Sequence, residues 1–287
     1  MKRLAFLIIL LSLAAAGCGS SGAVGEGAVS DVVSTTPTSG DAASTVTGPR
    51  ISYQVFFERG ETLWPVTRSE PATAAIGAAA LSSLLSGPTG AEQANGVGSV
   101  VPAGTTLLGL DISGGTATVD LSSEYQSGGG SLSMTMRLAQ VVYTLTQFPS
   151  VKRVALRLDG APVTVFSGEG IVLDRPQTRA DYQSLLPVIA VAAPGFGQRL
   201  TSPAHVAGLA NVFEANVSVE LLDQDGHVIA HDFTTARCGT GCWGSYALDL
   251  PFHVDHQQAG TIVVHDDDAA GSGTYPHEQR IAVVLTP

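Results

Sequence analysis

The chain has 287 residues, a formal net charge of −11 and three cysteines. Proteins that bind nucleic acids neutralise phosphates with clustered lysine and arginine side chains, and this acidic chain has no such cluster, so we expect no nucleic-acid partner. The length is sufficient for two domains of ordinary size.

The first residues have the pattern of a secretory signal. Lys2 and Arg3 form a positive start, and residues 4–16 are an apolar stretch too short to span a bilayer stably. The small residues directly before Cys18 resemble the bacterial lipobox, and this resemblance implies that the signal is cut before Cys18 and that this cysteine carries lipid. The alternative is an ordinary signal peptide with an incidental cysteine.

The expected anchor divides the N-terminal region into two parts. We expect residues 1–17 to be a lipoprotein signal peptide and residues 18–49, rich in Ser, Thr, Gly and Ala, to be a lipidated flexible linker. Because an acidic chain is repelled by anionic headgroups, acyl chains such as palmitate must supply the contact with the membrane. The expected location is the extracytoplasmic face of the cell membrane.

Residues 50–175 mix strand and helix patterns. Apolar spacing and turn signals predict a strand over 51–57, a second strand or edge strand over 61–68 that is broken at Pro65, and a helix from Pro71 to Ser86. A hairpin over 105–122, a helix over 131–149 and a strand over 151–160 follow. This order predicts an α+β domain, with helices on one face of an antiparallel or mixed sheet.

The segments "LWPVTR", "ALSSLLSGPT", "VPAGTTLLGLDISGGTATVDLSSEY" and "AQVVYTLTQFPSVKRVALRLDG" resemble the sporulation and spore germination family, often called the GerMN domain, across nearly all of residues 51–174. The resemblance implies a small module of exported bacterial proteins, some of them lipoproteins that work with envelope machinery or sensor kinases. The family has no known catalytic constellation, so the resemblance assigns no functional residue to this chain.

Residues 187–287 have the pattern of an all-β domain. Val217, Val219 and Leu221 alternate with residues that face the other way, and Asp225-Gly226 supplies a hairpin turn. We expect a sandwich of about seven strands. The segments "RLTSPAHVAGLANVFEANVSVELLDQDGHVIA" and "RIAVVLT" resemble the immunoglobulin-like domain of bacterial spore germination over residues 188–287. Family members carry a lysine-containing loop where this chain has the acidic "DDDAAGSGTYPHE".

Two cysteines remain when Cys18 is set aside. Cys238 and Cys242 flank a glycine-rich gap in "RCGTGCWG", so a tight turn can bring their sulfur atoms together, and an exported chain meets an oxidising compartment. We expect a disulfide. The alternative is a zinc site, for which His231 and His253 are the nearest further ligands in the sequence, at some distance.

Signals for catalysis are sparse. The chain lacks a G-x-S-x-G elbow and a phosphate-binding loop followed by lysine. Asp120 and Glu124 could form a carboxylate pair of the kind used in glycoside cleavage. We prefer the alternative, in which the two carboxylates belong to a turn at a strand end and to a helix cap on a solvated rim, because the sequence shows nothing that would separate their pKa values. We therefore expect no catalytic residue and no enzymatic activity.

Acidic and histidine-rich segments of the second half are the best candidates for a ligand. They are His253, Asp255 and His256 in "HVDH", and His265 with Asp266, Asp267 and Asp268 in "HDDD". On a strand, "HVDH" puts His253 and Asp255 on one face and His256 on the other, and "HDDD" lacks the spacing of a calcium loop, so we expect no metal and no cofactor. Trp64 and Trp243 are expected to pack rather than to stack on a sugar.

Taken together, these features favour a lipid-anchored, non-enzymatic cell-envelope interaction protein. It is expected to act as a scaffold or accessory subunit that binds an envelope protein or a cell-wall partner at the outer face of the cytoplasmic membrane. The alternative is a peptidoglycan-binding or carbohydrate-binding protein, with or without hydrolase activity.

Overall fold

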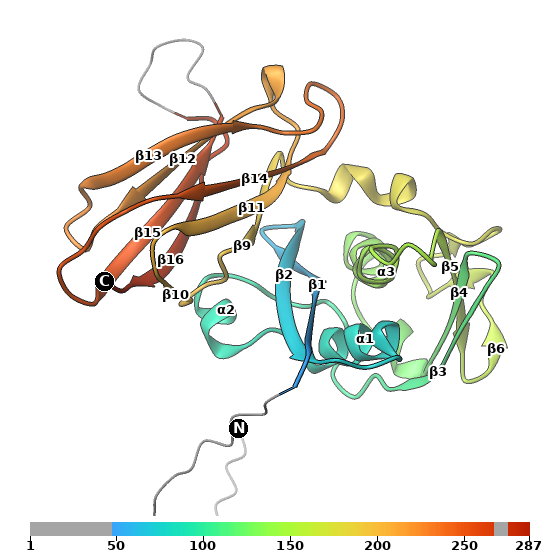
Figure 1. Cartoon of the computed structure of the whole chain (residues 1–287). Coiled ribbons are helices and arrows are strands. Elements are labelled where there is room, and N and C mark those ends of the chain that lie inside the picture. The colour runs from blue at the N-terminus through green and yellow to red at the C-terminus, as the bar shows by residue number, and fades with distance from the viewer. Residues whose placement is uncertain (1–47, 267–274) are drawn as a thin grey trace, which may run out of the picture. The chain divides into compact units, whose positions relative to one another are not determined.

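The computed structural model describes residues 48–266 and 275–287, which belong to a compact unit formed by Val46–Pro287 (Figure 1). The predictions for the signal peptide, for Cys18, for nearly all of the linker and for Asp267 and Asp268 fall outside these residues. Within the described part of the chain, no helix is both long and apolar enough to cross a membrane.

The first half of the described chain combines helices with sheets, which confirms the predicted α+β class. Its four-stranded sheet has the order β3-β4-β5-β6, in which β4 and β5 are parallel and the other pairs are antiparallel. The elements are β1 (Arg50–Arg59), β2 (Thr62–Pro71), α1 (Ile76–Ser86), α2 (Gly90–Ala94), β3 (Leu107–Ser113), β4 (Thr116–Leu121), η1 (Ser123–Gln126), α3 (Ser131–Leu145), β5 (Arg153–Leu158), β6 (Ala161–Pro162), β7 (Val165–Phe166), β8 (Ile171–Val172) and η2 (Arg179–Leu185).

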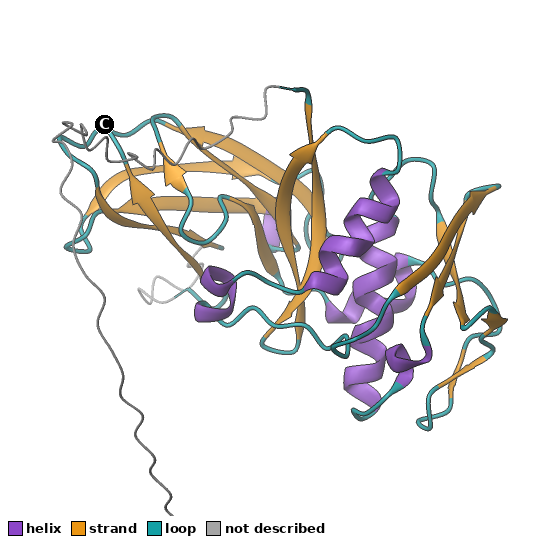
Figure 2. Cartoon of the chain, turned by 90° about the horizontal axis from the view of Figure 1, so that it is seen from below, coloured by secondary structure: helices purple, strands orange, loops and turns teal. Residues whose placement is uncertain are grey.

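The helices α1 and α3 occupy the middle of this half. Both contact the β1–β2 hairpin on one side and the four-stranded sheet on the other (Figure 2). The helices therefore cover one face of the sheet, as predicted, and the hairpin covers the helices. Apolar side chains from all three layers, among them Phe56, Leu81 and Val119, are completely buried and form the core.

Strand β2 continues through Pro65, which corrects the predicted break. Pro65 lies opposite Phe56, whose N–H points away from β2 and donates to Thr144 Oγ1 at 3.1 Å. Opposed residues of an antiparallel pair alternate between pairs that exchange hydrogen bonds and pairs that do not. Pro65 and Phe56 form a pair that does not exchange hydrogen bonds, so β2 loses no backbone hydrogen bond to β1 through the missing N–H of Pro65.

Helix α1 begins at Ile76 rather than at Pro71, a second correction. Pro71 ends β2 opposite Arg50, and just beyond it the N–H of Ala72 donates to Pro49 O at 2.9 Å. Proline suits the first turn of a helix, but here the pairing of the hairpin extends through it.

Side chains of α3 close the outer edge of β1. Besides the bond from Phe56 to Thr144, Gln140 Nε2 donates to Phe56 O at 3.1 Å. Gln147, just beyond the last turn, accepts the N–H of Gln54 at 2.7 Å and donates to Gln54 O at 2.5 Å. These three side chains recur at intervals of four and three, so they share one face of the helix. That polar face satisfies backbone N–H and C=O groups of β1, as a neighbouring strand would.

The second half of the described chain is all-β, as predicted. Its two sheets have the orders β10-β16-β15-β12-β13 and β14-β11-β9. Val217, Val219 and Leu221 are completely buried between them, and Asp225-Gly226 lies in the turn that joins β12 to β13. The elements are β9 (Ile189–Ala193), β10 (Arg199–Leu200), β11 (Ala204–Ala210), η3 (Phe213–Ala215), β12 (Asn216–Leu222), β13 (Val228–Thr235), β14 (Gly244–Leu250), β15 (Gln258–His265) and β16 (Gln279–Leu285).

The loop between β13 and β14 carries the two cysteines of the all-β half. The structure joins Cys238 and Cys242 in a disulfide whose Cα atoms are 6.0 Å apart. Both sulfur atoms are used in this bond, so neither is a free thiolate for a zinc ion.

The polar face of α3 generates a stability prediction. Thr144→Val keeps the volume of the side chain but removes the acceptor of the Phe56 N–H, and a buried unpaired N–H costs about 1–3 kcal/mol of unfolding free energy. Urea denaturation measures this loss. Thr135→Val, at a half-buried position of the same helix where the hydroxyl donates to Ser131 O within the helix, is the control and should change the free energy by less than about 0.5 kcal/mol. Equal losses in the two variants would contradict the role of Thr144.

The disulfide also makes a prediction. A peptide map of the purified protein without reduction should contain Cys238 linked to Cys242, because the two residues lie in one short turn with their Cα atoms 6.0 Å apart. Reduction should lower the free energy of unfolding by no more than about 2 kcal/mol, since the closed loop is short. Two free thiols, or stoichiometric zinc in place of the bond, would refute the pairing.

Candidate functional site

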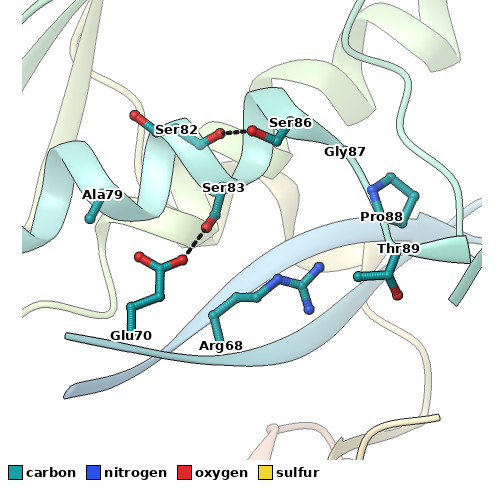
Figure 3. A pocket seen from close by; sticks show the side chains of 9 residues that line it. All are labelled: Arg68, Glu70, Ala79, Ser82, Ser83, Ser86, Gly87, Pro88 and Thr89. Atoms are coloured by element: carbon teal, nitrogen blue, oxygen red, sulfur yellow. Dashed lines mark hydrogen bonds between the residues drawn. The ribbon is translucent and has the colours of Figure 1, made fainter. Parts of the chain in front are cut away.

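A groove between β2 and α1 is a candidate site among the described residues (Figure 3). Its volume is about 510 Å³. Arg68 and Glu70 of β2 form one wall. The opposite wall and the end are formed by Ala79, Ser82, Ser83, Ser86, Gly87, Pro88 and Thr89. We call it the β2–α1 groove.

Local sequence signals set the end of this groove. Gly87, with a φ of 80°, ends α1 and turns the chain, because a left-handed conformation favours glycine. Pro88 follows, and Thr89 caps helix α2 through a reciprocal capping box with Glu92: the Glu92 N–H donates to Thr89 Oγ1, and Glu92 Oε2 accepts the Thr89 N–H at 2.7 Å. The carboxylate of Glu92 is thereby held beneath the groove.

Arg68 and Glu92 form a bidentate ion pair below this end of the groove. Arg68 Nη1 and Nη2 donate to the two carboxylate oxygens at 2.6 and 2.9 Å. The Glu92 side chain is only 8% exposed and that of Arg68 17%. Burial raises the pKa of Glu92, but the hydrogen bonds from Arg68 and Thr89 outweigh it, so this pKa lies below its usual range. The pair fixes β2 to α2.

A second set of hydrogen bonds connects the α1 wall of the groove to β2. Ser83 Oγ donates to Glu70 Oε1 at 3.0 Å and lies 3.1 Å from the hydroxyl of buried Tyr53. Burial is the main reason that the pKa of Tyr53 is raised. Ser86 donates to Ser82 O at 2.8 Å. No histidine lines the groove, so Ser83 has no imidazole base of the kind that activates a catalytic serine. The arrangement offers hydroxyls, one cation and one carboxylate for binding.

The structure places Asp120 next to the end of β4 and Glu124 in the short helix η1. Asp120 Oδ1 accepts the N–H of Gly160 at 3.0 Å, and Glu124 lies exposed in η1. A hydrogen bond from Ser122, followed by one from its own backbone, holds the pKa of Glu124 below its usual range. A general acid needs the opposite shift. The geometry therefore supports the interpretation as turn and cap carboxylates.

The segment "HVDH" is solvated, whereas His265 and Asp266 of "HDDD" are mostly buried. Residues 253–256 lie between β14 and β15 and form no strand, which corrects the predicted placement of "HVDH". His253 Nε2 lies 3.2 Å from Asp255 Oδ1, and both side chains are almost fully exposed. Asp266 Oδ2 lies 2.6 Å from His277 Nδ1.

One further group in the described chain has the composition of a metal site. Asp223, Asp225 and His227 lie together at the turn between β12 and β13. Asp223 Oδ1 already accepts the N–H groups of Asp225 and His227, each at 2.9 Å. These bonds are typical of a turn closed by an aspartate, and they explain the grouping without an ion.

Both tryptophans pack, as predicted. Trp64 is 2% exposed, and its ring centroid is 6.3 Å from that of Phe196. The guanidinium carbon of Arg59 lies 4.6 Å from the Trp64 ring centroid. Trp243 is half-buried and donates its Nε1–H to Pro187 O at 2.8 Å. Neither ring lines the β2–α1 groove.

Sequence inspection alone missed the groove and its ion pair. The capping box of α2 has a sequence signal, "TGAE" over residues 89–92, in which a hydroxyl residue precedes a glutamate by three positions. That signal locates Glu92 at a helix start. Its pairing with Arg68, which lies on a distant strand, depends on the folded chain.

Two family models match the chain. Residues 54–164 match the model described as "Sporulation and spore germination", and residues 188–272 match the "Immunoglobulin-like domain of bacterial spore germination". Both agree with the resemblances seen in the sequence, and neither description is that of an enzyme. The search of curated proteins found no match.

Solved structures show weaker likenesses. The first GerMN domain of the sporulation protein GerM from Bacillus subtilis is 24% identical, with 45% of this chain and 98% of that chain covered and a TM-score of 0.39. The tandem GerMN domains of GerM from Bacillus subtilis are 19% identical, with 70% and 62% covered and a TM-score of 0.42. A putative lipoprotein from Clostridium perfringens is 21% identical, with 49% and 95% covered and a TM-score of 0.34.

These TM-scores are too low to carry an argument, so the assignment rests on the family models. The two matches occur in tandem and fall on the α+β and all-β halves of the structure. The chain therefore has a spore germination domain architecture, in which a sporulation and spore germination domain is followed by an immunoglobulin-like domain of bacterial spore germination.

Proposed function

We propose that the protein is a lipid-anchored, non-enzymatic accessory protein of germination that binds a protein partner at the outer face of the cytoplasmic membrane. Two consecutive spore germination domains support the accessory role. The signal-like start and the small residues before Cys18 support the anchor. Fold analogy alone is a weak warrant for function, so the choice of partner rests on the groove.

The lining of the β2–α1 groove is the observation that favours a protein partner. The exposed Ser82 hydroxyl can donate and accept hydrogen bonds, and the exposed Ser86 hydroxyl, which already donates to Ser82 O, can accept one, which suits the alternating N–H and C=O groups of an extended peptide. Arg68 and Glu70 add one charge of each sign. None of the lining residues is aromatic, so the groove offers no ring on which a sugar could stack.

The anchor makes a first prediction. Cys18→Ala should abolish incorporation of labelled palmitate and leave the chain unprocessed or released from the membrane, because acyl chains supply the only membrane affinity expected of this acidic protein. Ser20→Ala, two residues further on, is the control and should remain lipidated. A wild-type chain that takes up no lipid, or a processed Cys18→Ala chain that stays in the membrane fraction, would rule out the anchor.

The groove makes a second prediction. A photoreactive benzoylphenylalanine in place of Ser86 should crosslink the full chain to an envelope protein in intact cells, because that position lines the groove. The same group in place of Ser113, exposed at the end of β3, is the control and should give no such product. Crosslinking of cell-wall glycan from position 86, or of the same protein from both positions, would contradict the proposed site.

A further inference from the structure

His265, the last residue of β15, has a fixed tautomer. Its side chain is only 6% exposed, and Nδ1 lies 2.8 Å from the backbone oxygen of Asp266. A carbonyl oxygen only accepts hydrogen bonds, so Nδ1 carries the hydrogen. The ring is also held by Tyr275, which stacks on it with 3.6 Å between the ring centroids. The neutral ring therefore presents the lone pair of Nε2.

That Nε2 atom is buried and has no hydrogen-bond partner. Glu220 Oε1, a carboxylate oxygen, lies 4.0 Å from it. Leaving a buried polar atom unpaired costs free energy, and native proteins rarely do so without a reason. The orphaned lone pair, directed near a carboxylate, indicates a site for a positively charged species.

The strand register brings a third group to this place. β12 lies between β13 and β15 (Figure 1). Glu220 on β12 is opposite His231 on β13, and His265 is opposite Ser218, two residues before Glu220. Directly opposed residues point to the same face of a sheet, and so do residues two apart on one strand. His231, Glu220 and His265 therefore share the outer face, away from the core side chains of β12.

We propose that His265 Nε2, the Glu220 carboxylate and His231 bind one divalent transition-metal ion of the zinc class. Two imidazoles and a carboxylate are a ligand set that suits zinc and disfavours calcium, which takes oxygen ligands. A histidine ligand commonly donates its other N–H to a carbonyl or carboxylate, and the bond from His265 Nδ1 to Asp266 O supplies this support.

The 4.0 Å between Nε2 and Oε1 fits a metal ion better than a proton. A hydrogen bond spans about 2.7–3.2 Å between heavy atoms, so a proton on Nε2 would not reach Glu220 in this geometry. A tetrahedral zinc ion, at about 2.0–2.2 Å from each ligand atom, holds two ligand atoms about 3.3–3.6 Å apart, so a small movement of the Glu220 carboxylate toward His265 suffices. The Glu220 side chain is 30% exposed and His231 is exposed, so both can turn toward the ion.

Zinc titration of the full chain, purified in detergent, tests this proposal by calorimetry. We expect one tight equivalent of Zn²⁺, no binding of Ca²⁺, and a loss of at least about tenfold in zinc affinity in each of His265→Gln, Glu220→Gln and His231→Gln. Glu220 and His231 lie at the surface, so their variants keep the proposal testable if His265→Gln unfolds. Zinc should also raise the melting temperature of the wild type more than that of Glu220→Gln.

Two control variants separate this site from other histidines. His227→Gln alters the turn group Asp223, Asp225 and His227, and His205→Gln alters an exposed histidine that lies 2.7 Å from Asp249. Neither should change the tight zinc affinity. Absence of tight zinc binding would overturn the site. So would a tight affinity that falls equally in the control variants, or one that survives in both Glu220→Gln and His231→Gln.

Discussion

The α+β half of the protein depends on side-chain hydrogen bonds that helix α3 makes to the open edge of β1. A two-stranded hairpin has two free edges, and an edge strand whose backbone groups lack partners is a poor structural element and a risk for aggregation. Here Gln140, Thr144 and Gln147 satisfy the N–H and C=O groups of Gln54 and Phe56. Further along, Glu58 exchanges backbone bonds with Gly98. The hairpin is thus held by directional bonds as well as by apolar packing.

This constraint also positions the groove. Because β1 is fixed against α3, its partner β2 lies at a defined distance from α1, and the space between them is lined by the short side chains of serines. Glu92 then ties α2 to β2 from below through Arg68. Ser83 is already hydrogen-bonded to Glu70, and Arg68 to Glu92, so these wall side chains need little ordering when a ligand binds.

Much of the fold is readable from local patterns, and the remainder is set by distant contacts. The alternation of Val217, Val219 and Leu221 identified a half-buried strand, and "SGG" over residues 113–115 identified the turn of a hairpin, because both signals involve neighbouring residues. The placement of Pro65 inside β2 could not be foreseen, since it depends on which side of β1 faces α3. Likewise, Gln140 and Thr144 look like ordinary helix positions until β1 is seen beside them.

The candidate sites were less predictable than the fold. The disulfide of Cys238 with Cys242 follows from close spacing along the chain. Arg68 and Glu92 meet only in the folded chain, and the relation of His265 to Glu220 and His231 depends on the register of three strands. The sequence pointed to the acidic residues after His265 as the candidate ligands. In the structure, the buried nitrogen without a hydrogen-bond partner belongs to His265 itself.

The ion pair of Arg68 with Glu92 has a consequence for how this family of sequences can vary. Replacing either residue alone leaves a charge with little water around it and no partner, which is costly, whereas replacing both with apolar residues of similar size is close to neutral. A single substitution at either position is therefore expected to be selected against. Across relatives, the two positions should change together or stay as they are, and an alignment of many sequences would record the contact between β2 and α2 as correlated variation at these columns.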